Sequence, residues 1–322
     1  MTYPESRITN HQSRIYIAGH RGMVGSAIWR ALTAKGYTNL IGKTSKELDL
    51  RNQQAVNYFI AKEQPDVIID AAAKVGGILA NNSYPYPFLM ENLQIQNNLI
   101  DAAHKLNVSK FIFLGSSCIY PKFAPQPLKE AYLLTDSLEP TNEWYAIAKI
   151  AGVKACEAIR KQFGKDFVSL MPTNLYGPHD NFDLESSHVM PAMIRKFHEA
   201  KENNHATVTL WGSGTPMREF LYVEDLAEAT IFAVENVLPE HLYNVGTGTD
   251  VTIKALAETI QNSVGHKGDI IWDRTKPDGT PRKLMDSSKL RSLNWAPKVA
   301  LEDGIKLAYQ WYLENSNTAR TN

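Results

Sequence analysis

The fold of this chain is decided near its amino terminus, by the stretch Arg14-Ile15-Tyr16-Ile17-Ala18-Gly19-His20-Arg21-Gly22-Met23-Val24-Gly25. An apolar run of strand type leads directly into three spaced glycines, and apolar residues then recur at helical spacing as far as residue 35. Glycines at such a strand–turn–helix junction allow a tight turn, let backbone N–H groups approach a pyrophosphate, and permit close packing of helix on strand. The helix N-terminus also attracts negative charge. The stretch therefore predicts a dinucleotide-binding βαβ unit.

Strand-like and helix-like segments alternate through the first half of the chain. Further strands are expected at residues 39–43, 66–72, 110–115 and 167–171, and helices at 53–63, 92–106 and 142–162. The segment 66–72 is nearly all apolar, as expected for a parallel strand covered on both faces. We therefore predict an α/β fold built on a Rossmann-type doubly wound parallel sheet.

The regular alternation ends after Pro172, where turn-rich pieces surround one expected helix near residues 189–201. Strand-like segments at 219–223 and 242–245 are expected to return the chain to the first sheet. We predict an NADP-binding domain formed by residues 1–173, with a flexible lead-in at 1–13, and continued by 217–246. A smaller, discontinuous α/β substrate domain is expected to comprise residues 174–216 and 247–322, with a ligand cleft between the two.

Charge and cysteine content narrow the class of protein. The 34 Lys and Arg residues balance 34 Asp and Glu residues, so no overall field attracts nucleic acid or an anionic membrane. The apolar runs fall short of a membrane span, and the polar amino terminus lacks the apolar core of a signal peptide. The two cysteines, Cys118 and Cys156, do not suggest a disulfide framework. We expect a cytoplasmic protein with a small-molecule substrate, no nucleic-acid or membrane partner, and no metal.

The end of the second expected strand indicates which nicotinamide cofactor is used. Enzymes that bind NAD usually place an Asp or Glu there to contact the ribose 2′-hydroxyl. Here the stretch is Gly42-Lys43-Thr44-Ser45-Lys46, with no acid before Glu47, and Arg21 lies inside the glycine turn. Cations at these positions complement a 2′-phosphate, although lysines are usually solvated surface residues. We therefore expect NADPH to be preferred over NADH.

Tyr145 and Lys149 lie four residues apart, so a helix places the phenol and the ammonium on one face. A nearby cation is expected to lower the pKa of the tyrosine, whose phenol then donates a proton to a ketone oxygen as hydride arrives. Ser116 or Ser117, just past the fourth expected strand, adds a hydrogen bond to the same oxygen. A YxxxK spacing alone is common on exposed helices. The order of glycine turn, strand-end serine and YxxxK predicts a hydride-transfer enzyme.

With these motifs the chain resembles the extended short-chain dehydrogenase/reductase family, and within it the GDP-L-fucose synthase family. The resemblance covers residues 14–313 and is carried by HRGMVG (20–25), AKVGGI (73–78), NN (81–82), GSSCIYPK (115–122), PTNLYGPHDN (172–181), WGSGTPMR (211–218), REFLYVED (218–225), NVGTG (244–248) and KPDGTPRK (276–283). It implies C3/C5 epimerisation of GDP-4-keto-6-deoxy-D-mannose, followed by reduction of the C4 ketone with NADPH. It also implies a homodimer formed through two helices per subunit, including the helix of Tyr145.

The resemblance assigns catalytic roles to five residues. Ser116, Tyr145 and Lys149 serve the reduction, while Cys118 is the base and His188 the acid of the epimerisation. A free cysteine is by default a small buried hydrophobe. Cys118, however, lies two residues beyond Ser116 at the same strand end, where a thiolate is able to remove a proton next to a ketone.

Binding roles follow from the same resemblance. Cofactor contacts are expected from Gly19, Arg21, Gly22, Met23, Val24, Gly25, Lys43, Asp49, Leu50, Ala72, Leu114, Gly115, Ser116, Tyr145, Lys149, Pro172, Asn174, Leu175 and His188. Substrate contacts are expected from Ser117, Asn174, Lys196, Trp211, Arg218, Asp278 and Lys283. Ser45 departs from relatives in which an arginine contacts the 2′-phosphate, which weakens the expected discrimination against NADH. Cys156 is expected to pack in the core and His179 to shape a loop.

Two alternative functions suit the same fold: another nucleotide-sugar 4-epimerase or 4,6-dehydratase, and a non-catalytic NADP-sensing protein. A nucleotide-sugar 4,6-dehydratase would carry an Asp-Glu pair after the strand-end Ser or Thr, where this chain has Ser117-Cys118. A simple 4-epimerase would retain NAD and favour an acid after the second strand. A non-catalytic NADP-sensing protein would tend to lose the tyrosine, lysine or serine, and all three are present. Epimerisation at C3 and C5 followed by reduction at C4 is therefore expected ahead of these alternatives.

Overall fold

The computed structural model describes residues 10–184, 186–276 and 278–316. Most of the expected lead-in at residues 1–13 lies outside the described residues. Within it, residues 10–13 form a turn in which the Ser13 amide donates to the Asn10 carbonyl oxygen (2.9 Å). Among the described residues, no helix is long and apolar enough to cross a membrane.

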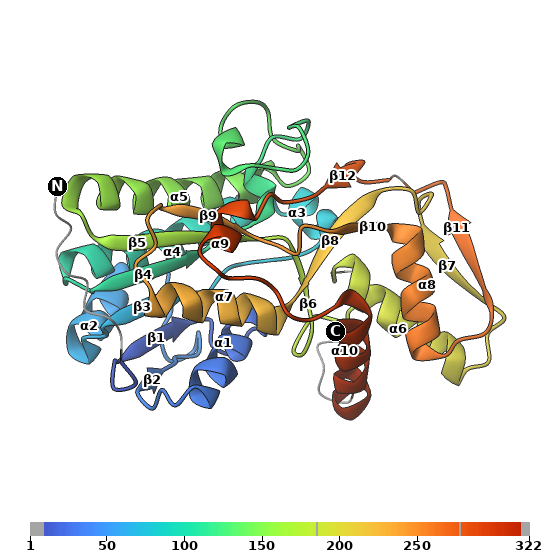
Figure 1. Cartoon of the computed structure of the whole chain (residues 1–322), viewed down its shortest axis with the longest axis horizontal. Coiled ribbons are helices and arrows are strands. Elements are labelled where there is room, and N and C mark those ends of the chain that lie inside the picture. The colour runs from blue at the N-terminus through green and yellow to red at the C-terminus, as the bar shows by residue number, and fades with distance from the viewer. Residues whose placement is uncertain (1–9, 185, 277, 317–322) are drawn as a thin grey trace.

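A six-stranded parallel sheet forms the centre of the larger part of the molecule (Figure 1), which confirms the predicted fold class. Its strand order is β2-β1-β3-β4-β5-β9. The strands are β1 (Ile15–Ala18), β2 (Leu40–Ile41), β3 (Val67–Asp70), β4 (Lys110–Leu114), β5 (Asp166–Pro172) and β9 (Leu242–Val245). Since all neighbours are parallel, the carboxyl ends of these strands share one edge, where doubly wound folds bind their ligands.

Helices cover both faces of this sheet. One face carries α1 (Met23–Ala34) and α7 (Val223–Glu235), and the other carries α2 (Gln53–Glu63), α4 (Pro85–Lys105) and α5 (Glu143–Phe163) (Figure 1). Successive strand residues point to opposite faces, so Ile15 and Ile17 enter the core beneath α1 and α7. Tyr16 and Ala18 enter the core beneath the other three helices. Burial on both faces explains the nearly continuous apolar strands.

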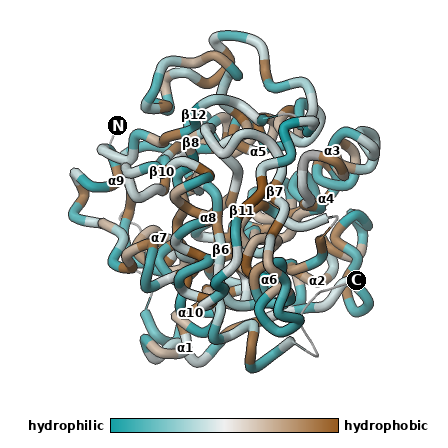
Figure 2. The backbone as a smooth tube through the Cα atoms, turned by 90° about the vertical axis from the view of Figure 1, so that its right-hand side faces the viewer, coloured by the Kyte–Doolittle hydropathy of each residue, from teal (hydrophilic) through white to brown (hydrophobic). Residues whose placement is uncertain are grey.

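A second, smaller group of elements packs around its own core. The strands are β6 (Asn174–Tyr176), β7 (Thr207–Trp211), β8 (Met217–Tyr222), β10 (Asp250–Thr252), β11 (Asp269–Asp273) and β12 (Arg282–Lys283). The helices are α6 (Val189–Glu202), α8 (Ile253–Val264) and α10 (Leu301–Asn315), along which hydrophobic and hydrophilic residues alternate (Figure 2). The short helices are α3 (Ile78–Ser83), η1 (Ser117–Ile119), η2 (Glu130–Tyr132) and α9 (Ser288–Ser292).

Only one of the two strands expected to rejoin the first sheet does so. β9 joins the first sheet as predicted, where it pairs with β5, whereas the segment expected at 219–223 forms β8, which pairs with β6, β10 and β12. That expectation was wrong because an apolar run fixes strand character but not the partner, and α7 returns the chain to the first sheet only afterwards. The division of the chain into two domains at the predicted boundaries stays a prediction.

Candidate active site

The glycine turn joins β1 to α1 with little room to spare. Gly19 has a φ of +77°, and a Cβ there would lie 2.7 Å from the Ala71 carbonyl oxygen. A Cβ on Gly25 would lie 2.2 Å from the Gly19 carbonyl oxygen, so helix and turn pack as closely as glycine permits. Gly22 is the N-cap of α1, and the first turn of this helix contains no acidic residue. The turn has the geometry and the field of an anion-binding helix N-terminus.

The structure brings the residues expected to contact the cofactor to one edge of the sheet. They end or follow β1, β2, β3, β4 and β5, or belong to β6: Gly19, Arg21, Gly22, Met23, Val24, Gly25, Lys43, Asp49, Leu50, Ala72, Leu114, Gly115, Ser116, Pro172, Asn174 and Leu175. Gly115 is closely packed: its amide donates to the Leu170 carbonyl oxygen (2.9 Å), and a Cβ at this position would clash with the Met171 side chain. This edge has the form of a dinucleotide site.

The end of β2 carries both cations and an acid. Glu47 accepts hydrogen bonds from the Thr44 amide (2.8 Å) and hydroxyl (2.7 Å), and lies 3.8 Å from Lys43 Nζ. These bonds, more than the charge of Lys43, hold the pKa of Glu47 below its ordinary value. Arg21 is exposed in the neighbouring glycine turn and adds to the positive field at His20. Lys46 is exposed as well.

Ser116, Cys118 and Lys149 meet where β4 ends. Ser116 is the N-cap of η1, and its Oγ accepts from the Cys118 amide (3.4 Å). Lys149 on α5 is 2% exposed and donates from Nζ to the Leu114 carbonyl oxygen (2.9 Å). Its ammonium also lies 4.7 Å from the centre of the Phe113 ring. The lysine is therefore fixed to the strand that carries the serine and the cysteine.

The pKa of Tyr145 differs from the one expected from the sequence. Lys149 Nζ lies 5.9 Å from the centre of the tyrosine ring, yet the pKa of Tyr145 is raised, chiefly by burial and also by Cys118 and Asp70. The expected lowering is wrong in this structure because desolvation disfavours the phenolate more than the buried lysine favours it. The phenol is therefore protonated at neutral pH, which is the form that can donate a proton.

Cys118 is a buried thiol with cations around it. Burial raises its pKa, while the charges of Lys283 and Lys149 and the hydrogen bond to Ser116 act in the opposite direction. Lys283 is half-buried, and burial lowers its own pKa against the attraction of Cys118. Cys156 on α5 has 0% exposure and packs in the core, as predicted.

His188 begins α6 as its N-cap residue and is exposed to solvent. The surrounding protein atoms lower the pKa of its imidazole, so the ring is largely neutral at neutral pH. The segment just before it touches the turn after β3, where the Gly77 amide donates to the Ser186 carbonyl oxygen (3.2 Å). A Cβ on Gly77 would lie 3.1 Å from the Ser187 carbonyl oxygen. This close approach joins the second group of elements to the edge of the first sheet.

Three of the expected substrate residues, Arg218, Lys283 and Asp278, lie together at the second set of strands. Lys283 on β12 pairs in register with Arg218 on β8, and the charges of Arg218 and Asp278 attract. Asp278 also accepts from the Ser213 amide (2.8 Å) and hydroxyl (2.6 Å), which ties it to the turn after β7.

A second pair of cations surrounds the exposed indole of that turn. Lys196 Nζ and Lys276 Nζ lie 5.9 Å and 5.4 Å from the centre of the Trp211 ring, which is 60% exposed. Two cations beside an open aromatic ring suit a nucleotide diphosphate and its base. Lys276 was not singled out from the sequence, because surface lysines are common and only the fold brings it to Trp211.

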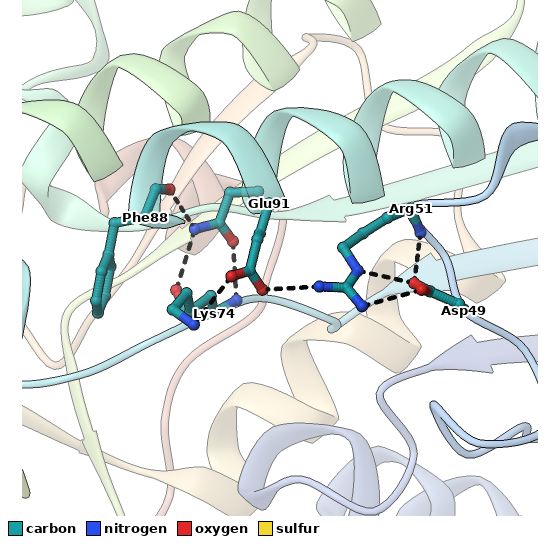
Figure 3. Close-up of polar contacts among 6 residues, drawn as sticks. Asp49, Arg51, Lys74, Phe88 and Glu91 are labelled. Atoms are coloured by element: carbon teal, nitrogen blue, oxygen red, sulfur yellow. Dashed lines mark hydrogen bonds and ion pairs between the residues drawn. The ribbon is translucent and has the colours of Figure 1, made fainter. Parts of the chain in front are cut away.

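A chain of ion pairs borders the cofactor edge (Figure 3). The Arg51 guanidinium binds Asp49 through Nε (2.9 Å) and Nη2 (3.0 Å), and its Nη1 lies 3.5 Å from Glu91. Glu91 on α4 also accepts from Lys74 Nζ (3.1 Å). The contacts connect the segment after β2 to the turn after β3.

The side chain of Asn92 holds the same turn through hydrogen bonds to the backbone of Lys74. Its side chain accepts from the Lys74 amide (2.9 Å) and donates to the Lys74 carbonyl oxygen (3.1 Å) and the Phe88 carbonyl oxygen (2.6 Å) (Figure 3). The Phe88 ring meets Tyr145 edge-on at 6.3 Å between centres. Asn92 is 2% exposed, so these bonds are shielded from water. One side of Tyr145 is thus packed against α4, the helix whose Asn92 side chain also holds the turn after β3.

Two buried acids at the site were not predicted. Asp70 ends β3 and Glu219 lies in β8, each with 0% exposure. Glu219 accepts from the Gly248 amide (2.7 Å) and the Met285 amide (2.9 Å), and its backbone oxygen accepts from Asn174 (2.8 Å). It therefore joins three segments next to Lys283. Asp70 offered one signal, a second acid inside the otherwise apolar run 66–72, which begins with Asp66.

Comparisons with known proteins agree with this geometry. Residues 15–246 match the NAD dependent epimerase/dehydratase family. The chain is 58% identical to GDP-L-fucose synthase 1 of Arabidopsis thaliana over 310 residues, 96% of either protein. It is 54% identical to GDP-L-fucose synthase of Escherichia coli (strain K12) over 319 residues, 96% of this chain and 99% of that protein.

Solved structures give the same result. The GDP-L-fucose synthetase of Naegleria fowleri bound to NADP has a TM-score of 0.89 at 30% identity, covering 97% of this chain and 96% of that one. MlghC, the GDP-mannoheptose C4 reductase of Campylobacter jejuni with NADP bound, has a TM-score of 0.87 at 40% identity, covering 95% and 99%. The chain belongs to the NAD-dependent epimerase/dehydratase family, among its GDP-L-fucose synthases.

Proposed function

We propose that this chain converts GDP-4-keto-6-deoxy-D-mannose to GDP-L-fucose, by epimerisation at C3 and C5 and then NADPH-dependent reduction of the C4 ketone. The observation that carries this proposal is the meeting of Ser116, Cys118 and Lys149 at the end of β4. A reductase needs the serine and the lysine, whereas an epimerase of carbons next to a ketone needs a base such as the cysteine. The identity of 58% and 54% to two GDP-L-fucose synthases supports the substrate.

The chain's own residues fit NADPH. The Gly19–Gly25 turn leaves no space for a Cβ at either end, and α1 presents its N-terminus without an acidic first turn. We propose that the exposed Arg21, with Lys43, binds the 2′-phosphate. When bound, NADPH supplies a hydride to C4 of the sugar.

In the proposed epimerisation, Cys118 is the base. Both C3 and C5 are next to the C4 ketone, so loss of either proton leaves an enolate whose charge rests on the C4 oxygen. The thiolate takes the proton, and Lys283 and Lys149 favour that charged form of the sulfur. His188 returns a proton to the opposite face from its protonated form, the minor form at neutral pH, which its exposure to solvent replenishes.

In the proposed reduction, Tyr145 gives its phenolic proton to the C4 oxygen as that carbon becomes an alcohol. Burial keeps the phenol protonated, and Ser116 lies at the adjoining strand end to donate to the same oxygen. The charge of Lys149 then favours the phenolate that remains. The epimerisation leaves C4 a ketone, so the reduction is the step that fixes the new configuration.

We propose that the nucleotide end binds to the second set of strands. Arg218, Lys283 and Lys196 supply positive charge for the diphosphate, and Trp211 offers an exposed ring to the base. The balance of charge over the whole chain does not oppose this, because attraction of a diphosphate depends on local cations.

Incubation with GDP-4-keto-6-deoxy-D-mannose and NADPH, with the product identified by NMR, tests this function. The expected product is GDP-L-fucose. A GDP-sugar that keeps the mannose configuration at C3 and C5 would make the chain a plain 4-reductase. Absence of NADPH oxidation with nucleotide 4-ketosugars would favour the non-catalytic alternative.

We further propose a homodimer in the cytoplasm. Two adjacent helices, α4 and α5, cover one sheet face, and α5 exposes Trp144 (42%) and Ile147 (38%) close to Tyr145. Cys118 and Cys156 are free thiols, which suits a reducing compartment. Light scattering should give about twice the 36.1 kDa of one chain. A mass of one chain would contradict the dimer.

A further inference from the structure

Asp70 is a fully buried carboxylate that the steps above do not use. It ends β3 with 0% exposure, between Ala18 of β1 and Phe113 of β4. Its Oδ1 accepts from the Ala72 amide (3.2 Å), while Oδ2 has no hydrogen-bond partner among the described residues. A buried carboxylate with an unsatisfied oxygen costs free energy, so its presence requires an explanation.

The register of the sheet places Asp70 on the same face as the catalytic helix. Residues paired in a parallel sheet point to the same side, and Ala18 and Phe113 both enter the core beneath α4 and α5. Lys149 Nζ lies 4.7 Å from the centre of the Phe113 ring. The carboxylate and the ammonium therefore occupy one buried layer, with Asp70 beside the ring over which Lys149 lies.

The hydrogen bond and the ring contact of Lys149 do not balance its charge. Lys149 is 2% exposed, and among the described residues its ammonium binds the Leu114 carbonyl oxygen and the face of the Phe113 ring. A buried ammonium needs an opposite charge to stay protonated. Burial lowers the pKa of Lys149, and Asp70 is the strongest of the groups that raise it again.

We propose that Asp70 is a positioning residue for the reduction, whose carboxylate keeps Lys149 charged and in place beneath Tyr145. This inference rests on the proposed reductase activity. It assigns Asp70 no part in the epimerisation, because Lys283 favours the Cys118 thiolate more strongly than Lys149 does.

The ionisable groups around Asp70 come from two elements besides its own. Tyr16 faces it from β1, and Tyr145, Lys149 and Cys156 face it from α5. The buried residues of α4 are all uncharged. Burial raises the pKa of Asp70 to about 6, so the carboxylate is charged at neutral pH and Lys149 is its cation.

The test compares Asp70→Asn with Asp166→Asn, which also removes a buried acid from a lysine. Asp166 pairs with Lys110 (3.1 Å) at the start of β5, the opposite edge of the sheet. In Asp70→Asn, reduction should fall by about tenfold or more, with the Michaelis constants changed less than about twofold. Exchange of solvent deuterium into C3 and C5 should keep its wild-type rate. Asp166→Asn should keep the wild-type rate of reduction.

The pH profile separates positioning from a structural role. Wild-type reduction should lose activity as the pH falls through about 6, and this limb should be absent in Asp70→Asn. Unchanged reduction and an unchanged profile in Asp70→Asn would overturn the inference. So would equal losses of reduction and deuterium exchange, which would make Asp70 a general structural residue.

A measurement without turnover keeps the inference separate from the proposed function. In wild-type protein carrying 13C-labelled lysine, the Lys149 side-chain signal should shift as the pH passes through about 6, when Asp70 gains its proton. In Asp70→Asn, Lys149 should lose its own proton at a lower pH than in the wild type. A Lys149 signal that is the same in both proteins would refute the inference even if no substrate is ever turned over.

Discussion

The ammonium of Lys149 donates a hydrogen bond to the carbonyl oxygen of Leu114 at 2.9 Å, and so joins helix α5 to the last residue of strand β4. Ser116 and Cys118 follow directly on that strand, and Tyr145 lies one turn before the lysine. This bond therefore holds α5, and Tyr145 with it, against the strand end that leads to the serine and the cysteine.

The first prediction concerns the division of labour at the site. Tyr145→Phe should abolish NADPH-dependent reduction, because the phenolic proton is the one given to the C4 oxygen. Exchange of solvent deuterium at C3 and C5 should persist, since Cys118 and His188 remain. The two rates are measured by NADPH absorbance and by NMR. Loss of both activities together would show that the two steps share a proton donor.

The second prediction concerns the base. Cys118→Ser should slow deuterium exchange at C3 and C5 by about a hundredfold or more, because a hydroxyl is a far weaker base than a thiolate. A wild-type exchange rate in this variant would return Cys118 to a packing role.

Lys283→Met offers a related control that keeps the thiol. Lys283 lowers the pKa of Cys118 more than any other group does, and so opposes the effect of burial. Its loss should therefore raise that pKa. The pH at which exchange reaches half its maximum should therefore move upward. No movement would show that Lys149 and Ser116 suffice.

The third prediction concerns cofactor choice. Arg21→Ala should raise the Michaelis constant for NADPH by about tenfold and leave that for NADH nearly unchanged, because only NADPH carries the 2′-phosphate. Lys46→Ala, which removes an exposed cation after β2 instead of one in the glycine turn, is the matched comparison. Equal effects of Arg21→Ala on both cofactors would mean that another residue reads the phosphate.

The fourth prediction concerns stability and pH. The carboxyl of Asp70 has an ordinary pKa of 3.8 and a pKa of about 6 in the folded chain. Between these values the folded state binds more protons than the unfolded state, so stability falls as the pH rises through this window. The full loss is on the order of 2–3 kcal/mol.

Urea unfolding of wild type and Asp70→Asn measures this effect. Below about pH 4 residue 70 is neutral in both proteins. The difference between their free energies of unfolding therefore does not change with pH there. From about pH 4 to 6 the variant should gain stability relative to the wild type. A difference that does not change over this range would mean that the carboxyl titrates normally in the folded chain.

Local pattern was a good guide to the elements and a poor guide to their partners. Helix α2 (Gln53–Glu63) has the predicted bounds, because its apolar spacing is regular. Helix α4 begins at Pro85, seven residues before the predicted start, because proline suits the first helical turn and the early residues are not periodic. The pairing of β8 with β6, β10 and β12 depends on distant segments, so periodicity could not predict it.

The site shows the same limit. The motifs predicted where Tyr145, Lys149 and Cys118 lie, but not the ionisation of the tyrosine, whose pKa is raised by burial. Burial of a single side chain depends on tertiary packing, which neighbouring residues in the sequence do not reveal. Asp70 and Glu219 escaped prediction for the same reason, because an isolated acid becomes significant only when the fold buries it.

In the proposed mechanism, one site first epimerises the sugar through Cys118 and then reduces it through Tyr145. A reaction of GDP-4-keto-6-deoxy-D-mannose and unlabelled NADPH in D2O, with the product identified by NMR, tests this order of steps. The expected product is GDP-L-fucose with deuterium at C3 and C5 and protium at C4. A reduced product with protium at C3 and C5 and the mannose configuration there would contradict this mechanism.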